Sequence, residues 1–422
     1  MDIGIVVEDS GYSKMGFKNP EYGNPGVSGT VFEFLMLIRY LCMASSDREV
    51  MVFHFGDNAY PDKCRSIKCN SHSDVVQYAK KQDVLLIVQN GLNVAFYEKL
   101  NTESIKTVLW AHNYITGEDA ERFSSMANIQ RVVFVGREQY DHYIAHDIIN
   151  KSTFIFNMFD SEQKTYYRNL KLKPIVTYTG SLIPAKGFHM LAHVWKDVLK
   201  KVPEAQLNVL GSGKLYDRRA MLGKYGIAEE NYENSFISSL VDERNAILPS
   251  VHFWGVIGEE KVNIYHETMV GVMNPTGASE TFGLSGVEME ACGIPIVTKK
   301  KYGLLDTVEN KKTGFLINNE KELLTAIVKL LKDRELNEVM GQNAKAFVST
   351  RFSPNKIIKQ WIQMFEDIES GKGAVYCKPD SNFKNDWKWL LLLNRKCREI
   401  IPAFPSIIGY RTRKREKGKI SR

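Results

Sequence analysis

The feature that most limits how this chain can fold is a repeated alternation of short apolar runs with longer amphipathic segments. Runs of roughly four to eight apolar residues predict buried strands, and apolar residues spaced three or four apart predict helices. The predicted strands are 3–7, 49–55, 84–88, 107–112, 131–136 and 152–157 in the first half, and 174–180, 206–211, 251–255, 270–275 and 294–298 in the second. Alternation of this kind is typical of parallel α/β domains. The sequence therefore predicts two doubly wound, Rossmann-like α/β domains.

The two halves are separated by a polar, basic stretch at residues 161–173, which we interpret as a linker. We expect a first domain at 1–160 and a second domain at 174–370, with a crossing of the last helix back to the first domain as an alternative. Residues 371–422 form a basic, aromatic tail. Two such domains are expected to face each other across a cleft at the carboxyl ends of their strands, where open α/β folds bind ligands.

The positive charge of the chain is concentrated in its tail. Residues 384–422 contain twelve basic and three acidic residues, whereas residues 1–383 carry a formal charge of −2. A near-neutral body argues against nucleic acid as a partner. The six cysteines are too few and too irregularly spaced for a disulfide framework, and no stretch approaches the roughly 18 apolar residues that span a bilayer. We therefore expect a cytoplasmic protein.

Residues 274–297 carry the most informative pattern. A strand is followed by a loop of small residues, and a helix is expected to start near Gly283 and to end at Cys292. The free amides at the start of such a helix form an anion site. If a diphosphate occupies it, Glu280 and Glu288 can each accept paired hydrogen bonds from vicinal hydroxyls, one from a ribose and one from a sugar. The alternative is that Glu280 only compensates the helix dipole and Glu288 is solvent-exposed.

A second pattern, at residues 179–187, lies between a predicted strand and a helix predicted at 186–202. A lysine at the start of a helix is unfavourable, because its charge opposes the helix dipole. We therefore interpret Lys186 as a ligand of a bound phosphate, the alternative being a solvated surface lysine.

Together these patterns resemble a known family. Gly180, Lys186, the Glu280-x7-Glu288 spacing and Cys-Gly-Ile-Pro at 292–295 are similar to the retaining nucleotide-sugar glycosyltransferases of family 4 (glycosyl transferases group 1). The resemblance covers about residues 174–365 and is weaker but collinear in the first half. It implies the GT-B fold, retention of the anomeric configuration, and a nucleoside-diphosphate sugar as donor.

The resemblance also implies roles for single residues. Glu288 is expected to bind the donor ribose, and Lys186 the diphosphate. Glu280 is expected at the transferred sugar, with His112 approaching that sugar from the first domain. We thus expect Glu280, Lys186 and His112 to be catalytic. The further donor-binding residues are expected to be Ser181, Thr281, Phe282, Gly283 and Leu284, with Gly26 and Gly29 from the loop at 22–30.

Three of these positions are less certain from the residues themselves. A glycine-rich loop alone is as typical of a plain flexible turn, and a lone histidine such as His112 is more often structural. Ser181 stands where the family commonly has an arginine, so the identity of a second phosphate-binding cation is open. Arg137 and Lys214 are candidate substitutes.

The sequence thus predicts a glycosyltransferase that moves a sugar, of hexose type, from a nucleoside diphosphate to an acceptor hydroxyl. No Asp-x-Asp sequence occurs, so we expect no metal ion and no cofactor. The alternatives are a nucleotide-sugar epimerase of the same fold and a catalytically silent carbohydrate-binding protein.

The tail suggests where such an enzyme works. Residues 384–410 combine tryptophan, leucine and isoleucine with lysine and arginine, and residues 411–422 contain seven basic residues and one acidic residue. This composition suits an anionic membrane surface. The alternative is that 384–410 packs on the first domain. With membrane binding, the chain would be peripheral on the cytoplasmic face, and a lipid-linked glycan of bacterial surface polysaccharide (O-antigen or capsule) assembly would be the natural acceptor.

Overall fold

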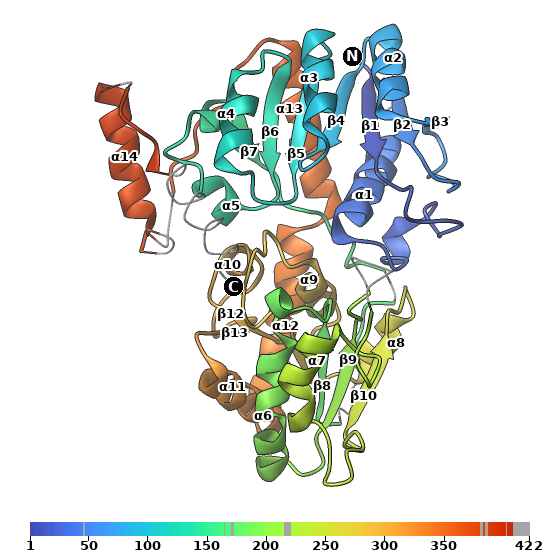
Figure 1. Ribbon diagram of the computed structural model, residues 1–422, viewed down its shortest axis with the longest axis vertical. Coiled ribbons are helices and arrows are strands. Elements are labelled where there is room, and N and C mark those ends of the chain that lie inside the picture. Colours follow the sequence, from blue (N-terminus) through green and yellow to red (C-terminus); the bar gives the residue numbers. More distant parts are fainter. Residues whose placement is uncertain are drawn as a thin grey trace. The chain divides into compact units, whose positions relative to one another are not determined.

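The computed structural model describes residues 1–44, 47–163, 165–169, 173–214, 221–379, 383–384, 387–401 and 403–407. The chain forms two compact units (Figure 1). Unit 1 comprises Met1–Asn19, Glu33–Asn157 and Asn355–Arg422, and unit 2 comprises Pro20–Phe32 and Met158–Pro354. The basic segment 411–422 lies outside the described residues.

Unit 1 is built on a seven-stranded sheet in which every neighbouring pair of strands is parallel. Its order is β3-β2-β1-β4-β5-β6-β7. The strands are β1 (Ile3–Val7), β2 (Val50–His54), β3 (Arg65–Lys68), β4 (Leu85–Gln89), β5 (Thr107–Ala111), β6 (Ile129–Phe134) and β7 (Ser152–Phe154). The helices are α1 (Gly29–Ala44, in this unit from Glu33 on), α2 (His72–Gln82), α3 (Val94–Thr102), α4 (Gly117–Ser125), α5 (Arg137–Asp141), α13 (Pro354–Glu369) and α14 (Lys388–Ile400).

Unit 2 has a six-stranded sheet, also parallel throughout, in the order β10-β9-β8-β11-β12-β13. The strands are β8 (Ile175–Thr179), β9 (Gln206–Leu210), β10 (Val251–Gly255), β11 (Val270–Val272), β12 (Ile296–Lys299) and β13 (Gly314–Ile317). The helices are α6 (Phe188–Lys201), α7 (Glu230–Phe236), α8 (Lys261–Glu267), α9 (Leu284–Ala291), α10 (Leu304–Thr307), α11 (Glu320–Lys332) and α12 (Arg334–Arg351). The predicted fold class, two Rossmann-like α/β domains, is confirmed.

The strand order of unit 2 fixes where a ligand can bind. Strand β8 lies between β9 and β11, so the connections leaving its two sides run in opposite directions. In open parallel sheets such a switch in strand order opens a crevice at the carboxyl ends of the two strands. The crevice expected here lies after Thr179 of β8 and after Val272 of β11.

Helix α14 in the tail packs on the rest of unit 1 through one of its faces. Leu391 is fully buried and belongs to the apolar core of that unit. The Lys388 ammonium forms ion pairs of 2.8 Å with both Glu138 and Asp141. Burial alone would lower the pKa of Lys388, but the two carboxylates outweigh it and raise that pKa above its usual value. This cluster of Lys388, Glu138 and Asp141 anchors the start of α14.

The opposite face of α14 is apolar and exposed. Trp389, Leu393 and Ile400 have exposed fractions of 50%, 52% and 80%. Their spacing of four and seven residues puts them on one side of the helix, and the exposed Lys396 falls within the same stripe. The tail therefore packs on unit 1 and also presents an apolar stripe to the surroundings. Among the described residues no helix has both the length and the hydropathy needed to cross a bilayer.

Candidate active site

A hollow lies at the switch in strand order of unit 2, and all the residues that line it belong to that unit. It contains about 940 Å³ of space between protein atoms, part of it open to solvent. Its wall is formed by the ends of β8 and β11, the start of α9, the start of α8 and the glycine-rich loop. Eight of the predicted site residues line it: Gly26, Gly29, Ser181, Lys186, Glu280, Gly283, Leu284 and Glu288.

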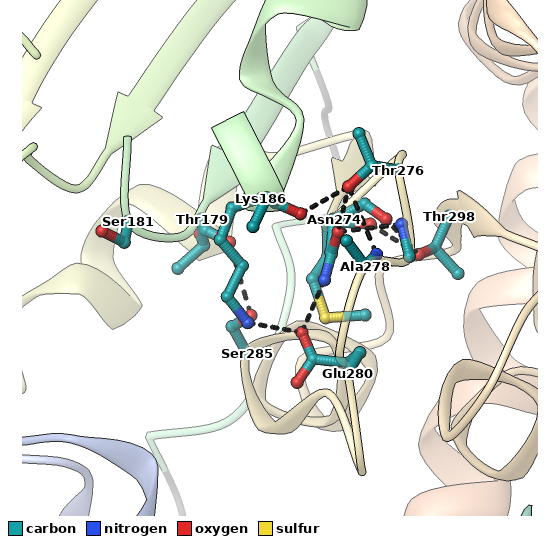
Figure 2. A network of polar contacts seen from close by, with 12 residues as sticks. Thr179, Ser181, Lys186, Asn274, Thr276, Ala278, Glu280, Ser285 and Thr298 are labelled. Atoms are coloured by element: carbon teal, nitrogen blue, oxygen red, sulfur yellow. Dashed lines mark hydrogen bonds and ion pairs between the residues drawn. The ribbon is translucent and has the colours of Figure 1, made fainter. Parts of the chain in front are cut away.

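Lys186 and Glu280 form a direct ion pair in this hollow. The Lys186 Nζ atom lies 2.6 Å from Oε2 of Glu280, and the same oxygen accepts a 2.8 Å hydrogen bond from Asn274 Nδ2 (Figure 2). Burial by itself would raise the pKa of Glu280. The charge of Lys186, together with hydrogen bonds from Lys186, Asn274 and the Gly283 amide, outweighs burial and holds this pKa below its usual range. Glu280 is therefore ionised, and the pair is neutral overall.

The predicted placement of Lys186 on the first turn of a long helix is wrong. Lys186 ends a short 3-10 turn (Pro184–Lys186), Gly187 has φ 73°, and α6 begins only at Phe188. A Cβ atom on Gly187 would lie 2.6 Å from Cγ2 of Thr276, so this glycine is needed both for its conformation and for space. The argument from the dipole of α6 does not apply, and Glu280 is what holds the Lys186 ammonium.

A second ion pair joins Glu288 to Lys261, a residue that the sequence analysis did not single out. The Lys261 Nζ atom lies 2.8 Å from Oε1 and 2.7 Å from Oε2 of Glu288. The side chains are 14% and 3% exposed, respectively. Glu288 is thus a buried carboxylate that faces the hollow with a lysine on it, not a solvated surface group.

The start of α9 has the geometry of an anion site. Gly283 precedes the helix with φ 82° and brings no side-chain cap to it. A Cβ atom on Gly283 would lie 3.0 Å from side-chain atoms of Met273 and Leu304, so the backbone approaches its neighbours closely. Thr281 and Phe282 are buried and are not among the residues that line the hollow. Any contact of these two residues with a donor would have to come from their backbone.

The loop at 22–30 contributes one wall of the hollow. The Asn24 Oδ1 atom accepts hydrogen bonds of 2.9 Å from the amides of both Gly26 and Val27, which fixes the turn. Gly26 has φ 93°, a conformation that favours glycine. Although it precedes the rest of unit 2 by more than a hundred residues in sequence, this loop belongs to that unit.

With this geometry in place, a comparison with known families is decisive for the second half. Residues 160–347 match the family model described as "Glycosyl transferases group 1". Residues 160–347 form a group 1 glycosyltransferase domain.

The relatives of this chain include a protein named for capsular polysaccharide biosynthesis. The chain is 26% identical over 205 residues to the "Capsular polysaccharide biosynthesis glycosyltransferase CapM" of Staphylococcus aureus, covering 48% of each chain. It is 23% identical over 329 residues to the "Putative glycosyltransferase YtcC" of Bacillus subtilis, covering 71% of this chain and 76% of that relative. The match thus spans about half the length of CapM and three quarters of YtcC.

Solved glycosyltransferases have the same fold. HepE of Anabaena, determined in complex with UDP and glucose, is 19% identical, with a TM-score of 0.63 over 87% of this chain and all of that one. The sucrose-phosphate synthase of Thermosynechococcus elongatus is 19% identical, with a TM-score of 0.67 over 88% of this chain and all of that one. At such low identity these likenesses establish the fold alone, which is the predicted GT-B architecture.

His112 belongs to unit 1 and is not among the residues lining the hollow. It directly follows β5 and packs against the rings of Trp110 and Phe34, with centroid distances of 4.4 and 5.7 Å. Burial lowers the pKa of His112 to about 3, so its imidazole is neutral near pH 7. Its predicted role at the sugar stays a prediction, with a neutral ring as the group that would act.

The family commonly has an arginine where this chain has Ser181, and the two candidate substitutes, Arg137 and Lys214, do not line the hollow. Ser181 does line it, and its Oγ donates a 3.3 Å hydrogen bond to the Ser212 carbonyl. Arg137 belongs to unit 1, where its Nε lies 2.9 Å from Asp141. Lys214 is exposed and is not a lining residue. Lys261 lines the hollow instead, and no local motif in the sequence marks it.

Proposed function

We propose that the chain transfers a sugar from a nucleoside-diphosphate sugar to an acceptor hydroxyl. The observation that carries this proposal is the hollow itself. It combines a buried carboxylate (Glu288), a half-buried one (Glu280), two lysines and a glycine-led helix start at the switch point of a parallel sheet. Carboxylates suit the vicinal hydroxyls of ribose and sugar, while ammonium groups and helix amides suit a diphosphate. The family of the second half and the complex of HepE with UDP point the same way.

In the reaction, the bond between the anomeric carbon and the phosphate oxygen breaks, and the acceptor oxygen forms the new bond to that carbon. The acceptor hydroxyl loses its proton, and the diphosphate leaves with the electron pair of the broken bond. Negative charge therefore grows on the diphosphate in the transition state. In this proposal Lys186 and the amides at the start of α9 stabilise that charge, as preorganised electrostatics.

We also propose that the transfer proceeds with retention, by attack on the same face as the departing diphosphate, and that the sugar is of hexose type. We assign no covalent nucleophile. Glu280 is already held by Lys186 and Asn274, so its proposed part is to orient Lys186 and to accept hydrogen bonds from sugar hydroxyls. In this proposal donor binding needs no metal ion and no cofactor, and the diphosphate is bound by Lys186 and the amides at the start of α9.

For the acceptor, we propose a lipid-linked glycan of bacterial surface polysaccharide assembly, reached at the cytoplasmic face of a membrane. Two observations support this choice. CapM is named for capsular polysaccharide biosynthesis, and α14 exposes Trp389, Leu393 and Ile400 next to a basic tail. An exposed apolar stripe with flanking lysine and arginine is typical of helices that lie in a membrane interface.

A ligand screen tests the donor part of the proposal. Binding to the native state alone raises the melting temperature. We expect at least one of UDP, GDP, ADP, CDP and dTDP to raise the melting temperature of the wild type, and the matching nucleotide sugar to do the same. Glu288→Gln should abolish this shift, measured against the unliganded melting temperature of the variant itself. Wild-type protein that responds to none of these nucleotides would overturn the proposal.

A further inference from the structure

The formal charges of the side chains that line the hollow sum to zero. Among its described lining residues the charged groups are two lysines, Lys186 and Lys261, and two glutamates, Glu280 and Glu288. Each lysine is paired with one glutamate, at 2.6 Å and 2.7 Å. A nucleoside diphosphate brings at least two negative charges. To bind it well, the hollow has to release positive charge from one of these pairs.

The two glutamates differ in the hydrogen-bond donors that each would keep if its lysine moved away. Glu280 also receives hydrogen bonds from the Asn274 side chain and the Gly283 amide. For Glu288, the hydrogen bond to Oε1 and the ion-pair contact at Oε2 both come from Lys261. Because Glu288 is only 3% exposed, losing Lys261 without replacement would leave a buried, unpaired charge. Lys261 can therefore leave only if another donor takes its place on Glu288.

Apart from its ion pair with Glu288, little favours the present position of the Lys261 ammonium. It is the first residue of α8, where the partial positive charge of the helix N-terminus repels a cation. Its four-carbon side chain is flexible, and its head lies in a hollow that is part open to solvent. Glu288 is the group that holds the ammonium in this position.

We propose that Lys261 is a donor-binding residue that exchanges partners: the ribose hydroxyls of the nucleotide replace it on Glu288, and the freed ammonium binds the diphosphate. This inference rests on the proposed function and adds a residue and a coupling to it. Two vicinal hydroxyls can donate one hydrogen bond to each of the two Glu288 oxygens that Lys261 contacts in this structure. Recognition of the ribose and binding of the diphosphate thus depend on each other.

This coupling distinguishes the proposal from the alternative that Lys261 binds the diphosphate whether or not ribose hydroxyls are present. A ligand without ribose hydroxyls leaves Lys261 on Glu288, so removing Lys261 should matter little for it. A ligand with both hydroxyls and a diphosphate should need Lys261. We therefore compare UDP with 2′,3′-dideoxy-UDP by titration calorimetry at constant ionic strength, in the wild type and in Lys261→Met. If the wild type prefers another base in the ligand screen, the same pair of analogues is used with that base.

For Lys261→Met we expect UDP affinity to fall about tenfold or more, the usual effect of losing one charge-assisted hydrogen bond. The affinity for dideoxy-UDP should fall less than about threefold. Lys261→Arg should keep most of the UDP affinity. Lys214→Met removes an exposed lysine outside the hollow and is the matched control; it should bind both ligands as the wild type does.

An equal loss for the two ligands would overturn the exchange, and no loss for either would overturn any role of Lys261 in binding. Failure of the wild type to bind any nucleoside diphosphate would overturn the proposed function together with this inference. If Lys261→Met does not fold, Lys261→Gln provides the same comparison.

Discussion

Lys186 and Glu280 are 94 residues apart in sequence, yet Nζ of the lysine lies 2.6 Å from Oε2 of the glutamate, in the wall of the hollow. The pair is only partly exposed, with side-chain fractions of 22% and 14%. Because Asn274 and the Gly283 amide also donate to Glu280, this carboxylate keeps partners when the lysine turns to a ligand. Glu280 thus positions the Lys186 ammonium, and other hydrogen-bond donors hold Glu280 in place.

This arrangement gives the first prediction. Replacing Lys186 with methionine should lower kcat by about a hundredfold or more, the usual cost of removing one group that stabilises developing negative charge. The Kd for the nucleoside diphosphate should rise less. Steady-state kinetics with calorimetry measure both quantities.

Lys186→Arg keeps the charge and should retain more activity than Lys186→Met. Lys196→Met, an exposed lysine on α6, is the matched control and should leave kcat unchanged. Unaltered turnover in Lys186→Met would show that this lysine does not act on the leaving group.

A second prediction concerns Glu290, which lies on α9 two residues after Glu288 and is fully buried. Burial raises the pKa of Glu290 well above its usual value, and the negative charge of Glu309 adds to the rise. The folded protein therefore keeps a proton on Glu290 at a pH where the unfolded chain has lost it. Since the unfolded state binds fewer protons, the free energy of unfolding should fall as pH rises above about 4.5, by up to about 1.4 kcal/mol per pH unit from this group.

Glu290→Gln keeps the shape of the side chain and cannot ionise. Its free energy of unfolding, relative to the wild type, should therefore increase steadily from pH 5 to pH 8 in urea titrations. A difference between the two proteins that stays constant over this range would show that Glu290 is ionised in the folded state.

Much of the fold could be predicted because it depends on local periodicity. The apolar runs at 3–7, 84–88 and 206–211 coincide with β1, β4 and β9 to within one residue or two. Strand β3 was missed because it is an edge strand of sequence Arg-Ser-Ile-Lys with no apolar run. Strand β13, of sequence Gly-Phe-Leu-Ile, was also missed.

The site could be predicted only in part. Glu280 and Glu288 lie on one continuous segment, a turn followed by a helix, so their spacing can be recognised as a local sequence pattern. The pairing of Lys261 with Glu288 depends on how α8 packs beside α9, and no spacing rule expresses that. Likewise, the position of Lys186 depends on the left-handed conformation of Gly187, which the sequence pattern did not distinguish from a helix start.

The third prediction concerns the buried cluster of Lys388, Glu138 and Asp141. Lys388→Met removes the cation and leaves Glu138 buried without it, and Asp141 with Arg137 as its remaining ion-pair partner. Breaking a buried ion pair in this way costs about 3–5 kcal/mol. We expect a loss of this size in the free energy of unfolding, measured by urea titration.

Lys396→Met changes an exposed lysine on the same helix and should alter stability by less than about 0.5 kcal/mol. Combining Lys388→Met with Glu138→Gln removes the buried carboxylate charge that the lysine balanced and should recover a large part of the loss. If Lys388→Met is as stable as Lys396→Met, α14 does not depend on this cluster.

The last prediction tests the apolar stripe of α14 as a membrane contact. Leu393→Asp puts a carboxylate in the middle of the stripe, where it would have to enter the lipid interface and would be repelled by anionic headgroups. We expect this variant to lose most of its co-sedimentation with vesicles containing phosphatidylserine. Val339→Asp is the matched control, because Val339 lies on α12 and is exposed to a similar extent, 50% against 52% for Leu393.

Deleting residues 411–422 should weaken binding to these vesicles further and reduce the dependence of that binding on salt, since each basic residue contributes about 1 kcal/mol near such a surface. Equal sedimentation of the wild type with and without vesicles would exclude the membrane as the partner of this stripe.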